Sequence, residues 1–197
     1  MNLLLRLNQI IQELESNKIS YSLAGGLVAS LYRKEPRATA DIDIAILTTD
    51  EKKASEILEK IGLKVQALRK ANLEGGPAFA IKKQNTPVYI LCGRSVEPGD
   101  FGVDLILSSM PWVEIALERS QANRIDFGFG PVTCITVEDL VLSKLYSVKN
   151  QSTRFMDLDD LKSIFEVNQK LDWVYLRHQM KQLNLTIPES LKPFLNL

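Results

Sequence analysis

Hydrophobic and polar positions follow two different periods along the chain. In residues 2–17, apolar residues such as Leu7, Ile10 and Leu14 recur every three or four positions, which predicts an amphipathic helix. The isoleucine-rich run 41–47 instead has the length and composition of a buried strand. The same patterns predict strands at 19–23, 64–68, 78–82, 88–92 and 102–107, weaker strands at 124–127 and 131–135, and helices at 27–32, 51–61 and 111–119.

The last third of the chain has a helical pattern. Thr136 and Asp139 resemble a capping box in which Asp replaces Glu, and apolar residues follow at helical spacing. Further helices are predicted at 154–168 and 171–183, with a short one from Pro188. We therefore expect an α+β fold with α/β-like features, made of a mixed sheet flanked by helices in residues 1–134 and a helical C-terminal subdomain in residues 135–197.

Composition narrows the class of protein. The 197 residues carry 24 basic and 24 acidic side chains and are 45% hydrophobic, as in a soluble globular domain. A net charge of zero argues against binding nucleic acid through bulk positive charge, although it is compatible with a local basic channel. Two cysteines and one histidine do not suit a disulfide framework or a structural zinc site. Because no apolar run approaches the ~18 residues that span a bilayer, we expect a cytoplasmic protein that does not bind membranes.

Five residues indicate a candidate site for phosphate and metal binding. Gly25 and Gly26 lie between a strand and a helix, where backbone N–H groups can approach a phosphate. Asp41 and Asp43 are two apart on a strand and so point to the same face. Asp104 is the lone charge in an apolar strand, where a carboxylate needs a partner or a metal ion. If the two strands are neighbours, the three carboxylates form a site suited to Mg²⁺ or Mn²⁺.

This arrangement resembles the DNA polymerase β-like nucleotidyltransferase superfamily. The resembling features are the glycine pair, the Asp-x-Asp strand and a third Asp on a later strand. The resemblance implies a nucleotidyltransferase-type sheet and a metal-dependent enzyme. Such an enzyme transfers a nucleoside monophosphate from an NTP to an acceptor hydroxyl and releases pyrophosphate. The acceptor can be an RNA end such as tRNA, a protein or a small molecule.

The chain is most similar to small bacterial nucleotidyltransferase-like proteins, including the AbiEii-type toxins of toxin–antitoxin systems. Residues 36–43 read PRATADID, which is similar to the R-x-T-x-D-I-D run of that group. The segment 136–145 resembles the start of the group's helical part, and Arg154, Asp157 and Asp160 match its R-x-x-D-x-x-D pattern. This group membership implies a cognate toxin or antitoxin partner.

The resemblance also implies roles for the site residues. Asp41 and Asp43 would be catalytic metal ligands for the nucleotide-bound ions, and Asp104 would be a third ligand and a general base. Gly25 and Gly26 would cradle the phosphates. The metal would be Mg²⁺ or Mn²⁺.

Further candidates would bind the nucleotide. Lys144 would contact the triphosphate, and Arg37, Arg154 and Asp157 are additional candidates. Many family members have Ser or Thr directly after the glycine pair, whereas this chain has Leu27. The missing hydroxyl contact must then come from backbone N–H groups, from Ser30 one turn later, or not at all. If it is absent, the chain is a binding component of a toxin–antitoxin pair that keeps the fold without turnover.

Structural interpretations compete with these roles. Asp41 and Asp43 could be strand-end acids paired with Arg33 or Arg37, and Asp104 could pair with a neighbouring basic residue.

The candidate residues in the helical part of the chain also have structural interpretations. Lys144 could be a surface lysine with a packed stem. Arg154, Asp157 and Asp160 could form an ion-pair row along one helix.

Overall fold

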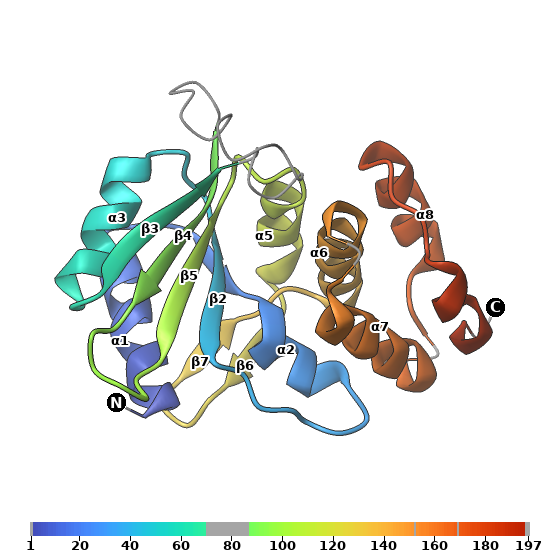
Figure 1. Cartoon of the computed structure of the whole chain (residues 1–197), viewed down its shortest axis with the longest axis horizontal. Coiled ribbons are helices and arrows are strands. Elements are labelled where there is room, and N and C mark those ends of the chain that lie inside the picture. Colours follow the sequence, from blue (N-terminus) through green and yellow to red (C-terminus); the bar gives the residue numbers. More distant parts are fainter. Residues whose placement is uncertain (1, 70–86, 152, 169, 196–197) are drawn as a thin grey trace.

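A five-stranded mixed sheet forms the centre of the protein (Figure 1). The computed structural model describes residues 2–69, 87–151, 153–168 and 170–195. The strands lie in the order β1-β2-β5-β4-β3, with β2 and β5 parallel and every other neighbouring pair antiparallel. The strands are β1 (Tyr21–Leu23), β2 (Asp41–Ile46), β3 (Lys64–Arg69), β4 (Val88–Arg94) and β5 (Gly102–Leu107).

Helices cover the sheet in the N-terminal part. The apolar stripe of α1 (Leu3–Ser16) is buried, as its periodicity predicts, and Asn2 caps its first turn. α3 (Glu51–Lys60) contacts α1, β3 and β4, whereas α2 (Gly25–Tyr32) and α5 (Val113–Ser120) contact β2. A two-stranded sheet of β6 (Arg124–Asp126) and β7 (Pro131–Thr133) precedes the C-terminal helices.

The C-terminal helices lie to one side of the sheet (Figure 1). They are α6 (Val137–Asn150), α7 (Phe155–Val167) and α8 (Trp173–Gln182), followed by a 3₁₀ segment, η2 (Glu189–Phe194). Both α6 and α7 contact α2, so the helical part is joined to the sheet through the helix that begins at the glycine pair. Thr136 accepts a hydrogen bond from the Asp139 N–H at 3.3 Å, which confirms the predicted cap of α6.

The structure confirms the predicted α+β fold. The strand predicted at 78–82 lies outside the described residues. Most boundaries differ from the prediction by one or two residues. At the site, α2 begins at Gly25 itself rather than at Leu27, and Pro111 precedes α5, which begins at Val113. No helix in the described ranges is long and apolar enough to cross a bilayer.

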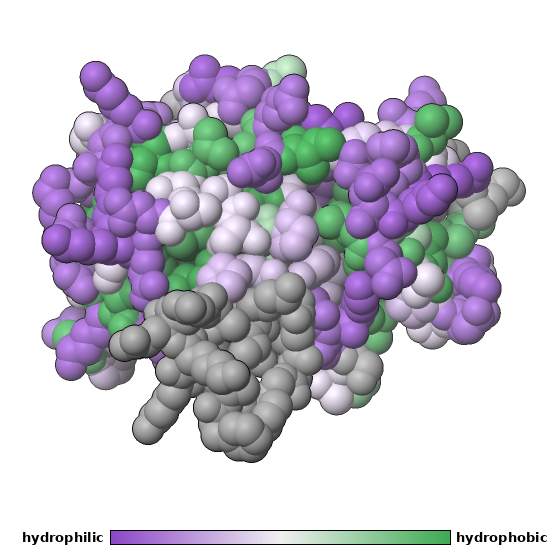
Figure 2. Space-filling view, turned by 90° about the horizontal axis from the view of Figure 1, so that it is seen from above, coloured by the Kyte–Doolittle hydropathy of each residue, from purple (hydrophilic) through white to green (hydrophobic). Residues whose placement is uncertain are grey.

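Hydrophilic side chains cover both ends of the face in Figure 2, whereas paler and hydrophobic ones lie between them.

The division into residues 1–134 and 135–197 stays a prediction, since one hydrophobic cluster includes buried residues from both parts, such as Leu7 and Leu161.

Candidate active site

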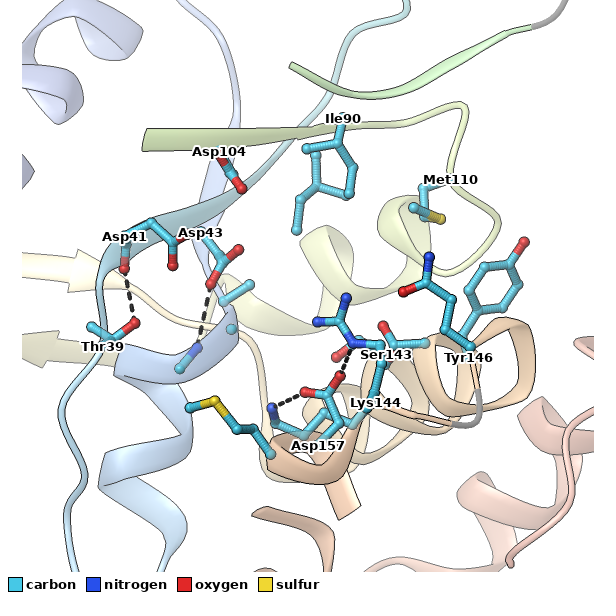
Figure 3. Close-up of a pocket in the computed structure, with 18 of the residues that line it drawn as sticks. Thr39, Asp41, Asp43, Ile90, Asp104, Met110, Ser143, Lys144, Tyr146 and Asp157 are labelled. Atoms are coloured by element: carbon cyan, nitrogen blue, oxygen red, sulfur yellow. Dashed lines mark hydrogen bonds and ion pairs between the residues drawn. The ribbon is translucent and has the colours of Figure 1, made fainter. Parts of the chain in front are cut away.

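The register between β2 and β5 places the predicted carboxylates together. Asp43 lies directly opposite Asp104 in this parallel pair, and Asp41 lies opposite Gly102. Ile42 and Ile44 point to the other face and are fully buried. The alternation that buries the isoleucines therefore puts all three carboxylates on one face, and Figure 3 shows them on one side of a cavity.

Gly25 packs directly against one of these carboxylates. Its φ of +60° is left-handed, and a Cβ at this position would overlap the Asp43 side chain. The next N–H, that of Gly26, donates a hydrogen bond to Asp43 Oδ2 at 3.3 Å (Figure 3). Glycine is therefore required at position 25 by both the backbone and the neighbouring carboxylate.

The Asp43 carboxylate lies in an unfavourable electrostatic environment. Burial, followed by the charges of Asp41 and Asp104, raises the pKa of Asp43 to about 7. Burial and Asp104 also raise the pKa of Asp41. Within the part of the chain that is described, Asp43 makes no ion pair with a basic side chain. A buried carboxylate among like charges is a donor set that fits a divalent cation.

Asp104 does have a basic partner, Arg94 at the end of β4. The guanidinium bonds both Asp104 oxygens, with Nη2 at 3.1 Å from Oδ2, and Nη2 is also 3.7 Å from Asp41 Oδ2. The alternative that Asp104 pairs with a nearby basic residue is thus what the structure shows. Among the described residues, no three His, Cys, Asp or Glu side chains are assembled to hold a metal ion as they stand. Asp104 is thus paired with Arg94 in this arrangement, whereas Asp41 is only within ion-pair distance of it and Asp43 is bonded by the Gly26 N–H.

Lys144 lies across the cavity from the carboxylates (Figure 3). It is only 4% exposed, so the surface-lysine interpretation is wrong. Its Nζ is 2.8 Å from Asp157 Oδ1 and 2.6 Å from Asp160 Oδ2. Arg154 pairs with Asp157 along α7 at 2.5 Å. The predicted ion-pair row therefore exists in part, but it also connects α7 to α6.

Asp160 holds a second set of cations. Arg37 donates two hydrogen bonds of 2.8 Å to its two oxygens, and Arg33 also pairs with it. Burial alone would raise the pKa of Asp160, but the bonds from Arg37, Lys144 and Arg33 outweigh burial and lower it to about 2. Arg33 and Arg37 thus pair with this carboxylate, and the alternative that they neutralise the strand acids is not what the structure shows.

A cavity of about 650 Å³ joins the two charged groups. Its lining includes Gly25, Gly26, the three strand carboxylates, Arg37, Lys144, Arg154 and Asp157. Ile106, Met110 and Trp112 form an apolar part of its wall. The cavity therefore brings together nearly all of the predicted site residues from segments far apart in the sequence.

Ser30 is the exception among the predicted residues. Its hydroxyl donates to the carbonyl oxygens of Gly26 and Arg37 and accepts from the Arg37 N–H, and it does not line the cavity. Ser30 thus fixes the 33–39 loop to α2. A different hydroxyl lies at the glycine pair: a Cβ on Gly26 would be 2.8 Å from Thr39 Oγ1. The spacing of the sequence does not indicate this contact, because Thr39 reaches Gly26 only through the fold of that loop.

The fold and the comparisons with known proteins point to the same class of protein, the nucleotidyltransferases. The sequence profile described as "Nucleotidyl transferase AbiEii toxin, Type IV TA system" matches residues 10–190. The chain belongs to this AbiEii nucleotidyltransferase family. The resemblance to the polymerase β-like superfamily is therefore confirmed, and nucleotidyl transfer is the general chemistry of the family. No curated protein sequence matches the chain significantly.

Three solved structures are similar to this chain at low sequence identity. The antibiotic-resistance factor ANT(2″)-Ia, in complex with adenylyl-2″-tobramycin, aligns with a TM-score of 0.52 at 15% identity, covering 90% of this chain and 94% of that one. A nucleotidyltransferase-like protein from Paracoccidioides brasiliensis aligns with a TM-score of 0.47 at 18% identity, covering 92% of each chain. The lincomycin-bound lincosamide adenylyltransferase LnuA aligns with a TM-score of 0.48 at 21% identity, covering 80% of this chain and 95% of that one.

Proposed function

We propose that this chain transfers a nucleoside monophosphate from an NTP to an acceptor hydroxyl at the cavity between β2, β5 and α6. The observation that supports this most strongly is the pairing of Asp43 with Asp104 in register, beside Asp41 and the glycine turn. The acceptor oxygen would form a bond to the α-phosphorus, and the bond from that phosphorus to the bridging oxygen of the β-phosphate would break. Pyrophosphate would leave with that electron pair.

Mg²⁺ or Mn²⁺ fits the carboxylate side of the cavity. Asp41, Asp43 and Asp104 would hold the ions, which when bound would neutralise phosphate charge and lower the pKa of the acceptor hydroxyl. Asp104, once released by Arg94, is the group in position to accept the hydroxyl proton. Asp43 must be ionised to act as a ligand, so a pH above its pKa of about 7 favours metal binding.

The glycine turn and the helices would bind the nucleotide. The positive end of α2 favours an anion: its N-cap residue, Ala24, makes no side-chain cap hydrogen bond, and the Gly26 N–H already bonds one carboxylate, that of Asp43. Lys144 faces the cavity as a cation whose position is fixed by Asp157 and Asp160. Three cations of this ion-pair network, Arg37, Lys144 and Arg154, line the cavity. They are the groups that would contact the triphosphate.

The acceptor would be an RNA end such as tRNA, a protein or a small molecule. The test is to incubate the purified chain with each α-labelled NTP, Mg²⁺ and total cell extract, and to separate RNA, protein and small molecules. We expect label in one of the fractions with the wild-type chain and none with Asp104→Asn. Label that depends neither on Mg²⁺ nor on Asp104 would contradict the proposal.

A second candidate function follows from Leu27. If no group replaces the hydroxyl that many family members have after the glycine pair, the chain would act as a binding component that keeps the fold without turnover. The family's description as the toxin of a Type IV system supports a cognate antitoxin in either case. We propose the cytoplasm, where NTPs are present, as the place of action. Binding of a Mg²⁺–NTP complex with no transfer to any fraction would favour this second function.

A further inference from the structure

Arg94 lies at the point where the sheet meets the carboxylates. It is the last residue of β4, and the register that pairs Gly93 with Val103 places it opposite Gly102 at the start of β5. A Cβ on Gly102 would lie 2.9 Å from Arg94 Nη1 and 3.2 Å from its Cδ. The absence of a side chain at position 102 therefore lets the arginine lie flat across β5 and reach Asp104, two residues further along.

The guanidinium occupies the oxygens that a metal ion would use. Both terminal nitrogens bond Asp104, one to each oxygen, and Nη1 also donates to the Gly93 carbonyl oxygen at 3.0 Å. Asp41 Oδ2 lies 3.7 Å from Nη2, so the cation extends toward a second carboxylate. Asp43, by contrast, is bonded by the Gly26 N–H. Arg94 thus competes for Asp104 directly, for Asp41 weakly, and not for Asp43.

Arg94 and Asp104 differ in how far their side chains are exposed to solvent. The Arg94 side chain is 49% exposed, whereas the Asp104 side chain is 14% exposed. A half-exposed arginine can move into solvent at small cost, because water replaces its hydrogen bonds. The less exposed Asp104 carboxylate is held by its strand, and a cation beside it offsets the cost of its burial.

We propose that Arg94 is a positioning residue that holds Asp104 in the metal-free protein and must be displaced before Asp104 can ligate a divalent ion. This inference rests on the proposed metal-dependent function. It implies an order of events: Asp43 and Asp41 can receive a cation first, and the ligation of Asp104 follows the exchange of Arg94. Arg94 then weakens metal binding at Asp104 specifically, and removing it strengthens that binding.

The test is a titration with Mn²⁺ alone, measured by calorimetry and by electron paramagnetic resonance of free Mn²⁺. The wild-type chain is compared with Arg94→Gln, with Arg94→Lys and with Lys64→Gln. Lys64 is exposed on β3 and lies opposite Arg94 in the register, so this control removes the same charge one strand further from Asp104. We expect Arg94→Gln to bind Mn²⁺ about fivefold more tightly than Lys64→Gln, the order of effect for a half-exposed ion pair. Arg94→Lys should fall between the wild type and Arg94→Gln, because lysine keeps the charge without the two-pronged contact.

A double variant tests whether Arg94 acts through Asp104, and further variants separate the role of Arg94 from the proposed metal site. Adding Asp104→Asn to Arg94→Gln should remove the gain, since the arginine acts through that carboxylate. The inference is overturned if Arg94→Gln binds no more tightly than Lys64→Gln, or if the gain persists without Asp104. If Mn²⁺ binds the wild type and Asp43→Asn abolishes the binding while Arg94→Gln changes nothing, only the inference on Arg94 fails. If no variant binds Mn²⁺, the proposed metal site fails together with it.

Discussion

Replacing Asp43 by Asn tests whether this carboxylate lacks a compensating cation in the metal-free protein. Burial, then the charges of Asp41 and Asp104, raise its pKa from 3.8 to about 7. The folded protein therefore binds this proton more tightly than the unfolded chain does. By linkage, the free energy of unfolding falls as the pH rises from about 4 to 7, and the full penalty is present above pH 7.

The magnitude follows from the pKa difference. At about 1.4 kcal/mol for each pH unit, the penalty is at most about 4 kcal/mol at pH 8 and roughly 2 kcal/mol at pH 5. Water and side-chain movement reduce both values. Asparagine removes the charge, and its oxygen can still accept the Gly26 N–H. We therefore expect Asp43→Asn to stabilise the metal-free protein by about 2 kcal/mol more at pH 8 than at pH 5.

Urea unfolding followed by circular dichroism, in EDTA at both pH values, measures this difference. Asp159→Asn is the control, because its side chain is 61% exposed and its pair with Arg33 is at the surface. The control should change stability by less than about 1 kcal/mol at either pH. If Asp43→Asn destabilises the metal-free protein at pH 8, or if its effect is the same at both pH values, the carboxylate is not electrostatically strained and the reasoning is wrong.

Four further predictions concern the elements that hold the site. Asp160→Asn should destabilise the fold by about 3 kcal/mol at pH 7, because it removes the buried carboxylate that Arg33, Arg37 and Lys144 share; a loss below 1 kcal/mol in urea would contradict this. Gly25→Ala should cost about 2 kcal/mol for its left-handed φ and should also abolish Mn²⁺ binding, which titration would detect. Thr136→Ala should cost about 1 kcal/mol by removing the cap of α6, measured by thermal unfolding against Thr136→Ser, which should retain most of the stability. The affinity for Mn²⁺ should fall as the pH drops below about 7, because Asp43 then holds a proton; an affinity unchanged between pH 6 and 8 would contradict its role as a ligand.

Local patterns predicted the elements that form this site. The isoleucine alternation in 41–47 showed which face Asp41 and Asp43 occupy, and the apolar run around Asp104 marked a buried strand. The sequence pattern did not show that the two strands are parallel neighbours, because strand order depends on contacts between distant segments. The family resemblance implied only that Asp104 joins Asp41 and Asp43 as a ligand, and the register of Asp43 with Asp104 agrees with this.

The ion pairs between distant segments could not be predicted from local sequence patterns. Asp160 pairs with Arg33 across 127 residues of sequence, and no spacing rule connects positions so far apart. Arg94 ends a strand whose pattern gives no sign that its side chain turns along β5, since this depends on the missing side chain of Gly102. Ser30 shows the reverse case: helical spacing placed it one turn after the glycines, but its hydroxyl bonds to the backbone of the neighbouring loop.

Calorimetric titration with each NTP, in the presence and absence of Mg²⁺, tests most directly whether this cavity is a metal-dependent nucleotide site. We expect the wild-type chain to bind at least one NTP only when Mg²⁺ is present, and we expect Asp43→Asn to abolish this binding while the chain remains folded. Absence of Mg²⁺-dependent binding for every NTP, or equal binding by Asp43→Asn, would contradict it.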